Sequence, residues 1–454
     1  MSTTVLDGCS VVTMNGARAE FASGHLVTDG TRISAVGEGP APRNLEGARY
    51  VDASGCLATP GLVNTHHHLY QWATRGFAVD GTLFEWLTAL YPVWGRMDAE
   101  TVQLAATGSL AWLARSGCTT TTDHNYVFPR GGGDVLAAEI EAARAVGLRF
   151  HPTRGSMDLG ESDGGLPPDN VVEDIDEILA ATERAIDTHH DPSFDSMLRI
   201  GVAPCSPFSV TGDLLVQAAE LARAREVRLH THLCETEDET AFCLERFGRR
   251  PVEYLADVGW MSDRVWLAHT VWPSPAEVAR LGAAGVGAAH CPSSNMILGS
   301  GLAPIAELRA AGAPVGLGVD GSASADSASL WLEARTAMLQ GKLRHGAGAM
   351  SARDALEIAT RGGASVLGRA GEIGRLSVGA CGDLVVWPLS GVAFAGALSD
   401  PVEAWLRCGP VSERHTVVAG RLVVEDGAPV HPDLEEQLAV HRRVSARMQE
   451  VSRA

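Results

Sequence analysis

The sequence predicts an α/β fold, a (β/α)8 TIM-like barrel, joined to a small β-sandwich domain that both chain ends build. Apolar runs alternate with amphipathic segments through the middle of the chain, which is typical of a parallel sheet covered by helices. Eight such runs occur, and β-rich segments flank them at both ends. The predicted boundaries are 1–58 and 376–430 for the discontinuous β domain, 59–375 for the barrel, and 431–454 for a C-terminal helix.

The small domain is predicted from short apolar runs with turn residues between them. Asp29-Gly30 separates two such runs, and an Asp-Gly pair supplies the positive φ that a tight hairpin needs. Near the other end, 383–387 and 417–424 read as a strand and a second hairpin. Because neither segment alone could cover an apolar face, we expect the two to pair into one domain.

The barrel strands are predicted from the eight apolar runs. Segments 99–114, 135–145 and 212–224 between them have helical periodicity. An open doubly wound sheet would also alternate strand and helix, but it would need a phosphate-binding GxGxxG motif after its first strand, where this chain has a histidine cluster. The eight runs are 61–66, 119–124, 148–152, 198–203, 227–232, 265–269, 286–290 and 315–320.

Length and composition indicate an acidic globular protein. Of its 454 residues, 45% are apolar, and 55 Asp and Glu against 36 Lys and Arg give a net charge of −19. Such a charge offers no attraction for phosphates, so we expect no nucleic-acid and no membrane partner. Because the first residues lack a basic patch followed by an apolar stretch, we expect a cytoplasmic protein. Nine cysteines without CxxC spacing argue against disulfides and against a thiolate zinc site.

Histidine and aspartate stand at the ends of five predicted strands, and barrels of this kind place their catalytic side chains at that face. Alternate residues of a strand share a face, so the first strand can direct two histidines at one ion. Imidazole and carboxylate ligands suit zinc or ferrous iron, and a set of three histidines and one aspartate leaves a position for water. The residues are His66, His68, His230, His232, His269, His290 and Asp320.

The order of these motifs resembles the amidohydrolase superfamily. The matching stretches are PGLVNTHHH at 60–68, HTHLCE at 230–235, LAH at 267–269, HCPSSN at 290–295 and GVDG at 318–321, and the resemblance spans essentially the whole chain. It implies a metal-dependent hydrolase, an enzyme that acts on C–N bonds of cyclic amidines. It also implies a set of metal ligands, which here are His66, His68, His232 and Asp320.

The chain's one lysine bears on the number of metal ions. Binuclear members hold two ions through a carboxylated lysine on the fourth strand, but Lys342 lies beyond the eighth strand and the fourth ends at 203–205. The resemblance therefore implies one divalent ion per subunit, zinc first and iron as the alternative, as in the aromatic-amine deaminase branch. That branch shares the HxxE spacing of His232 and Glu235. A bridging Glu or Asp would also allow two ions, but the fourth strand offers no candidate.

The resemblance implies catalytic roles for three residues. Glu235 corresponds to the family's proton shuttle, Asp320 to the group that takes a proton from water activated at the ion, and His269 to a hydrogen-bonding partner of the hydroxide or oxyanion. His230 and His290 are expected to orient the site. The alternative for Glu235 is a solvated position in the acidic stretch 235–239.

Several stretches resemble the 8-oxoguanine deaminases and their isoxanthopterin-deaminase and triazine-hydrolase relatives, namely 119–129, 154–157, 203–208 and 322–326. The implied reaction converts 8-oxoguanine and water to urate and ammonia. A flat ring needs an aromatic floor and polar groups at its edges. The candidates for these contacts are Gln71, Trp72, His124, Tyr126, Arg154 and Cys205. Trp72 could instead belong to the core, Cys205 could be a packing residue, and Arg154 could anchor a loop.

Two other functions stay open at this point. The same hydroxide could displace chloride or an alkylamine from an s-triazine, or deaminate a pterin. A non-catalytic relative that kept the barrel as an assembly surface is the third possibility, although such proteins typically lose ligands and this sequence retains all of them. The resemblance further implies a heterocyclic amine as the small-molecule partner and a homo-oligomeric enzyme.

Overall fold

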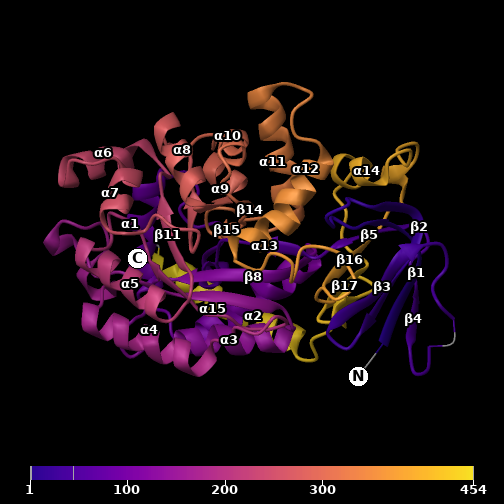
Figure 1. Cartoon of the computed structure of the whole chain (residues 1–454). Helices are drawn as coiled ribbons and strands as arrows, with labels where there is room; N and C mark the ends of the chain where they lie inside the picture. Colours follow the sequence, from indigo (N-terminus) through magenta and orange to yellow (C-terminus); the bar gives the residue numbers. More distant parts are fainter. Residues whose placement is uncertain (1–2, 44, 453–454) are drawn as a thin grey trace.

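The computed structural model describes residues 3–43 and 45–452 and contains a closed eight-stranded barrel beside a nine-stranded sheet (Figure 1). The predicted fold class is confirmed. Residues 1, 2, 44, 453 and 454, which fall within the predicted domain boundaries, lie outside the described residues.

All eight barrel strands are parallel, and each overlaps one of the predicted runs. The barrel closes where Leu317 pairs with Asn64. In order, the strands are β6 (Leu62–Asn64), β8 (Cys118–Asn125), β9 (Arg149–Ser156), β10 (Gly201–Pro204), β11 (Leu229–Leu233), β12 (Val265–His269), β13 (Gly287–His290) and β14 (Val315–Leu317).

The first and eighth strands stop earlier than the sequence pattern indicates. β14 ends at Leu317, and Asp320 instead begins the short strand β15 (Asp320–Gly321), which pairs in parallel with β7 (His67–His68). The side-chain amide oxygen of Asn64 accepts a hydrogen bond from the Val319 N–H at 2.9 Å, so β6 holds the segment between β14 and β15. This small ladder places His67 opposite Asp320 and His68 opposite Gly321.

Helices surround the barrel, and the predicted helical segments coincide with α2, α3 and α5. Asp98 and Asp134 cap α2 and α3 by accepting hydrogen bonds from backbone N–H groups of the first turns, at 2.8 Å and 3.0 Å. The helices around the barrel are α1 (Leu83–Trp94), α2 (Ala99–Arg115), α3 (Val135–Val146), α4 (Ile175–His189), α5 (Gly212–Ala224), α6 (Glu237–Phe247), α7 (Pro251–Asp257), α8 (Pro275–Ala284), α9 (Pro292–Ile297), α10 (Ile305–Ala310), α11 (Leu330–His345), α12 (Ala352–Glu357) and α13 (Gly363–Val366).

Both ends of the chain build the second sheet, as predicted. β5 and β16 pair in antiparallel register from Pro60–Leu384 to Cys56–Pro388. The nine strands form one continuous hydrogen-bonded sheet, and apolar side chains from both chain ends, among them Leu26 and Val417, share one buried cluster. The strands are β1 (Thr3–Val12), β2 (Glu20–Asp29), β3 (Arg32–Glu38), β4 (Arg49–Asp52), β5 (Cys56–Pro60), β16 (Leu384–Pro388), β17 (His415–Val418), β18 (Arg421–Glu425) and β19 (Ala428–Pro429).

Two further helices complete the fold. α14 (Pro401–Arg407) lies between β16 and β17, and α15 (Leu434–Ser452) returns to the barrel, where the Ser445 hydroxyl donates to the backbone oxygen of Ala73 at 2.7 Å (Figure 1). Among the described residues, no helix is both long and apolar enough to cross a membrane.

Candidate active site

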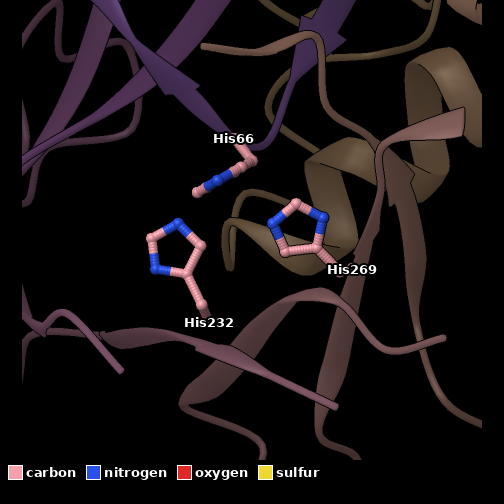
Figure 2. Close-up of side chains that lie close together, drawn as sticks. All are labelled: His66, His232 and His269. Carbon is pink, nitrogen blue, oxygen red and sulfur yellow. The ribbon is translucent and has the colours of Figure 1, made fainter. Parts of the chain in front are cut away.

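Histidine and aspartate side chains from four parts of the barrel meet at its C-terminal face. Nε2 of His66 and Nε2 of His68 lie 3.2 Å and 3.3 Å from the same carboxylate oxygen of Asp320. His232 on β11 brings its Nε2 to 3.2 Å from that of His68. Figure 2 shows the rings of His66, His232 and His269 turned toward a common point. All five side chains are buried.

Backbone carbonyls fix the tautomers of His68 and His232. Nδ1 of His68 lies 2.6 Å from the His124 oxygen, and Nδ1 of His232 lies 2.7 Å from the Cys205 oxygen. Because a carbonyl oxygen only accepts, both Nδ1 atoms must carry the proton, and each Nε2 is left with a lone pair. Two lone pairs then face each other at 3.2 Å, an arrangement that a cation between them would stabilise.

The same reasoning applies to His66. Nδ1 of His230 donates to the Trp266 backbone oxygen at 2.9 Å, so its Nε2 accepts the Nδ1–H of His66 at 2.8 Å. Nε2 of His66 is buried, has no hydrogen-bond partner among the described residues, and faces Asp320. Three bare imidazole nitrogens and one carboxylate oxygen form a donor set without thiolate, which fits a divalent ion of the zinc type.

Glu235 and His269 lie beside this donor set. Nδ1 of His269 donates to the side-chain oxygen of Asn295 at 2.9 Å, which turns its Nε2 toward Glu235 at 3.4 Å and Asp320 at 3.9 Å. Burial, and then the nearby carboxylates of Asp320 and Glu239, raise the pKa of Glu235 well above its usual range. Burial therefore favours the protonated form of Glu235, which is the form that can donate a proton.

A carboxylate that the sequence analysis did not single out, Glu239 on α6, holds the segment that presents Glu235. Its two oxygens accept the backbone N–H groups of Cys234 and Glu235, both at 2.8 Å. Its own N–H donates to the Thr236 hydroxyl at 3.2 Å. The T-x-x-E spacing of 236–239 is a capping signature and was the available signal for this role.

A cavity opens onto these groups, and aromatic residues form much of its wall. Trp86 and Tyr91 come from α1, Tyr126 follows β8, and Phe208 follows β10. The cavity holds about 30 Å³, because α1 lies over it and the Trp86 indole N–H donates to the Ala323 oxygen at 3.2 Å. A buried acid, a metal donor set and aromatic walls together are typical of an enzyme site for a flat ring.

Comparison with known proteins identifies the family. The model of the amidohydrolase family matches residues 57–423, which is well over half of the chain. The chain belongs to the amidohydrolase family. This amidohydrolase is therefore a hydrolytic enzyme, and deaminases and hydrolases are its named relatives.

Two curated relatives and one solved structure resemble this amidohydrolase along nearly all of its length. The 8-oxoguanine deaminase of Pseudomonas aeruginosa is 46% identical, over 98% of each chain. An isoxanthopterin deaminase from an unknown prokaryotic organism is 37% identical, over 91% of this chain and 90% of its own. The atrazine chlorohydrolase of Arthrobacter aurescens TC1, a crystal structure complexed with zinc, matches with a TM-score of 0.92 and 34% identity, over 97% of this chain and all of its own. The donor set and the zinc-bound neighbour both indicate a divalent metal.

The structure brings together the predicted metal ligands and the predicted catalytic residues of this amidohydrolase. His230 is buried beside them and bonds His66, whereas His290 is buried, lines a different cavity, and its Nδ1 has no partner among the described residues. Lys342 lies on α11, where its ammonium donates to the Ala347 oxygen at 2.8 Å, and the fourth strand ends at Pro204. That strand carries no lysine that could bridge two ions.

Of the six predicted ring contacts, Tyr126 and Cys205 line the cavity. His124 lies behind it, stacked on His232 at 4.9 Å, with Nε2 donating to the Ala203 oxygen at 3.0 Å. These three residues lie at the C-terminal ends of the second and fourth strands, beside the donor set.

The other three candidates, Gln71, Trp72 and Arg154, do not line the cavity. Gln71 lies under the β15 turn, where a Cβ at Gly321 would overlap its amide. Trp72 lies on the short 3-10 helix η1 (Leu69–Thr74), half-buried against the main hydrophobic core as in the alternative given for it, with the Arg75 guanidinium 4.1 Å from its ring.

Arg154 anchors a loop, which is the alternative role given for it in the sequence analysis. Its guanidinium binds both oxygens of Glu173, at 2.7 Å and 2.8 Å, and lies 3.7 Å above the Phe128 ring. Trp86, Tyr91 and Phe208 supply the aromatic wall that the sequence analysis assigned to Trp72. The dense aromatic spacing of 84–94, directly after the histidine motif, was the available signal.

Proposed function

We propose that this amidohydrolase removes the exocyclic amine of a purine-like bicyclic ring, converting 8-oxoguanine and water to urate and ammonia. The observation that carries the proposal is the approach of the buried Glu235 to His269, at 3.4 Å, beside the donor set and within an aromatic-walled cavity. The relative named 8-oxoguanine deaminase, 46% identical over 98% of this chain, supports this choice of substrate.

The proposed metal ligands are His66, His68, His232 and Asp320, with one zinc ion per subunit and iron as the alternative. The donor set contains no sulfur, and the fourth strand offers no bridging lysine, which supports a single ion. When bound, such an ion lowers the pKa of water toward neutrality and so provides a nucleophile.

The protein's own groups then handle protons and orientation. Nε2 of His269, left bare by the bond from Nδ1 to Asn295, accepts a hydrogen bond from the attacking water and orients it. Asp320 Oδ2, 3.9 Å from the same nitrogen, takes up a proton from that water. Glu235 delivers its proton to the ring nitrogen, then takes over the proton held by Asp320 and passes it to the departing amine, because an amine leaves readily only when it is protonated. The hydroxyl group on the attacked carbon loses its proton to Glu235 as it becomes the carbonyl, which restores both carboxyl groups.

The cavity favours a free base over a bulkier nucleoside. Leu83, Trp86 and Leu87 of α1 close it on one side, and it holds about 30 Å³ with α1 in place. A planar bicyclic ring could enter after a small displacement of α1, between the aromatic rings of Trp86 and Tyr91, whereas an attached sugar would require a larger one.

Hydrolysis of an s-triazine is the second candidate, and the likeness to the atrazine chlorohydrolase structure supports it. To separate the two, the purified enzyme is incubated with 8-oxoguanine, isoxanthopterin, guanine and a chlorotriazine, and the release of ammonia and chloride is followed. We expect ammonia from 8-oxoguanine at the highest kcat/KM. Chloride release alone, with ammonia from none of the three bicyclic amines, would replace the proposal by the triazine reaction.

A further inference from the structure

A second cavity lies at the opposite end of the barrel from the candidate active site. It holds about 380 Å³ and is lined by residues near the N-terminal ends of four strands. His151 lies on β9. Arg228 and Arg264 immediately precede β11 and β12, and Arg199 lies shortly before β10. Gly368, which is exposed, forms part of its rim.

Buried nitrogens around this cavity lack hydrogen-bond partners among the described residues. His151 is 2% exposed, and its Nδ1 has no partner. Nε of Arg199 and Nε of Arg228 are likewise buried without an acceptor. Nη2 of Arg228 donates to a neutral group, the backbone oxygen of Asp263, at 2.8 Å. Because native proteins pair most of their buried donors, several unpaired donors around one cavity are available to a ligand that brings acceptor oxygens.

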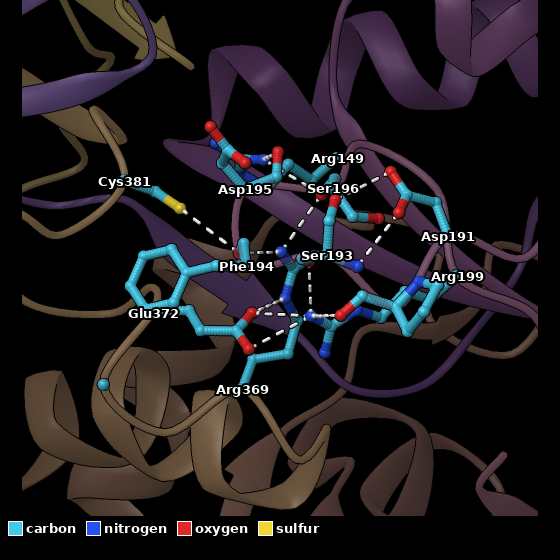
Figure 3. Close-up of polar contacts among 12 residues, drawn as sticks. Arg149, Asp191, Ser193, Phe194, Asp195, Ser196, Arg199, Arg369, Glu372 and Cys381 are labelled. Atoms are coloured by element: carbon cyan, nitrogen blue, oxygen red, sulfur yellow. Dashed lines mark hydrogen bonds and ion pairs between the residues drawn. The ribbon is translucent and has the colours of Figure 1, made fainter. Parts of the chain in front are cut away.

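The carboxylates near these arginines do not pair with all of their nitrogens. Glu226 and Asp263 also line the cavity, and Glu226 lies 3.7 Å from Arg264. Arg199 and Arg369 share the single carboxylate of Glu372, at 2.9 Å and 2.8 Å (Figure 3). Nη1 of Arg369 is buried without a partner among the described residues. Several buried guanidinium nitrogens therefore remain without an acceptor although carboxylates lie near them.

The pKa values of two groups at this cavity, Arg228 and His151, are lowered. Burial lowers the pKa of Arg228 to about 10, with Asp263 opposing the shift and Arg264 adding to it. Burial also lowers the pKa of His151 well below its usual range, and Arg369, Arg199 and Arg228 lower it further. A neutral His151 can still donate a hydrogen bond from one ring nitrogen.

We propose that this cavity at the N-terminal end of the barrel, the basal cavity, binds a small oxyanion, either a phosphate group or the carboxylate of an organic acid. The oxygens of such an anion would accept hydrogen bonds from Arg228, Arg199 and His151, and guanidinium groups match the geometry of both anions.

The proposed oxyanion site is distinct from the metal donor set. Trp266 lies near both sites, because its ring is 6.0 Å from the Arg228 guanidinium and is stacked at 4.3 Å on the ring of His230, which is not itself a ligand. His230 in turn bonds His66 at 2.8 Å. None of the residues that line the basal cavity belongs to the donor set, so an anion bound there would contact no metal ligand.

Isothermal titration calorimetry of the metal-loaded enzyme with inorganic phosphate, and separately with succinate, tests the proposal at constant ionic strength. We expect saturable binding of one ion per chain, with the tighter probe indicating the class of anion. Arg228→Gln should weaken that binding about tenfold or more, because a charge-assisted hydrogen bond is lost. Arg249→Gln removes an exposed arginine that pairs with Asp257 at 2.9 Å, and should leave the affinity unchanged.

Three results would overturn the proposal. The first is the absence of saturable binding of either probe to the wild-type enzyme. The second is equal affinity in wild type and Arg228→Gln. The third is binding that survives Arg228→Gln and is lost when the metal is removed, which would place the anion at the donor set. If Arg228→Gln does not fold, Arg264→Gln at the exposed rim replaces it, with a several-fold loss of affinity expected.

Discussion

At the scale of single residues, the donor set depends on groups that are not themselves ligands. Backbone oxygens of His124 and Cys205 hold the protons of two histidines on Nδ1, and His230 does the same for His66. Each bond leaves one Nε2 free to bind a metal. Because these partners are backbone or buried ring atoms, the geometry is set before any ion arrives.

The role of Glu235 can be separated from metal binding. Glu235→Gln should lower kcat at least about 100-fold, the usual contribution of general acid–base catalysis, because the amide cannot transfer the proton. Metal content should stay at that of the wild type, since Glu235 lies beside the donor set and its carboxylate is 3.4 Å from His269. Ammonia release and metal analysis measure the two quantities on one preparation.

Glu237→Gln is the matched control for this substitution. Glu237 is exposed on the first turn of α6, two positions away, and its replacement should leave both quantities unchanged. Activity retained by Glu235→Gln would remove Glu235 from the mechanism, and loss of metal from that variant would make it a ligand.

At the scale of elements, α1 both completes the cavity and closes it. Leu83, Trp86, Leu87 and Tyr91 of this helix line the cavity, while Trp86 also bonds Ala323 in the loop after β15. α1 therefore forms one wall of the cavity, and the Trp86 bond holds that wall against the loop after β15.

Trp86→Ala should raise KM about tenfold or more and change kcat less, because the ring wall is lost while the proton-transfer groups stay in place. Initial rates over a range of 8-oxoguanine concentrations give both constants. Thr88→Ala, on the exposed face of the same helix, should leave them unchanged. A fall in kcat with KM unaltered would mean that α1 contributes to the chemical step instead of substrate binding.

The elements also show what the sequence could and could not predict. The barrel strands were recognisable because apolar runs alternate with amphipathic segments, and the predicted run 265–269 coincides with β12. The place of Trp72 outside the cavity was not recognisable, because it depends on the register of the 3-10 helix after the histidine motif. Glu239 acts through backbone groups of its own loop, which a pattern of ligand residues does not show.

At the scale of the whole molecule, one face of the second sheet packs against the barrel in a shared hydrophobic cluster. The buried pair of Arg149 on β9 and Asp383 before β16 joins the barrel to the second sheet at 2.6 Å. Asp383 also accepts the backbone N–H of Ala419 at 2.8 Å. A buried ion pair with further hydrogen bonds specifies how the parts dock, and it leaves the C-terminal face of the barrel open for the site.

The central claim is that one metal ion in this donor set supports deamination of a purine-like ring. The most direct measurement adds zinc stepwise to the metal-free enzyme and records urate formed from 8-oxoguanine. We expect activity to rise in proportion to the added zinc and to level off at one equivalent per chain. His232→Ala should stay inactive, because it lacks one of the metal ligands. No urate at any zinc level, or a plateau at two equivalents, would contradict it.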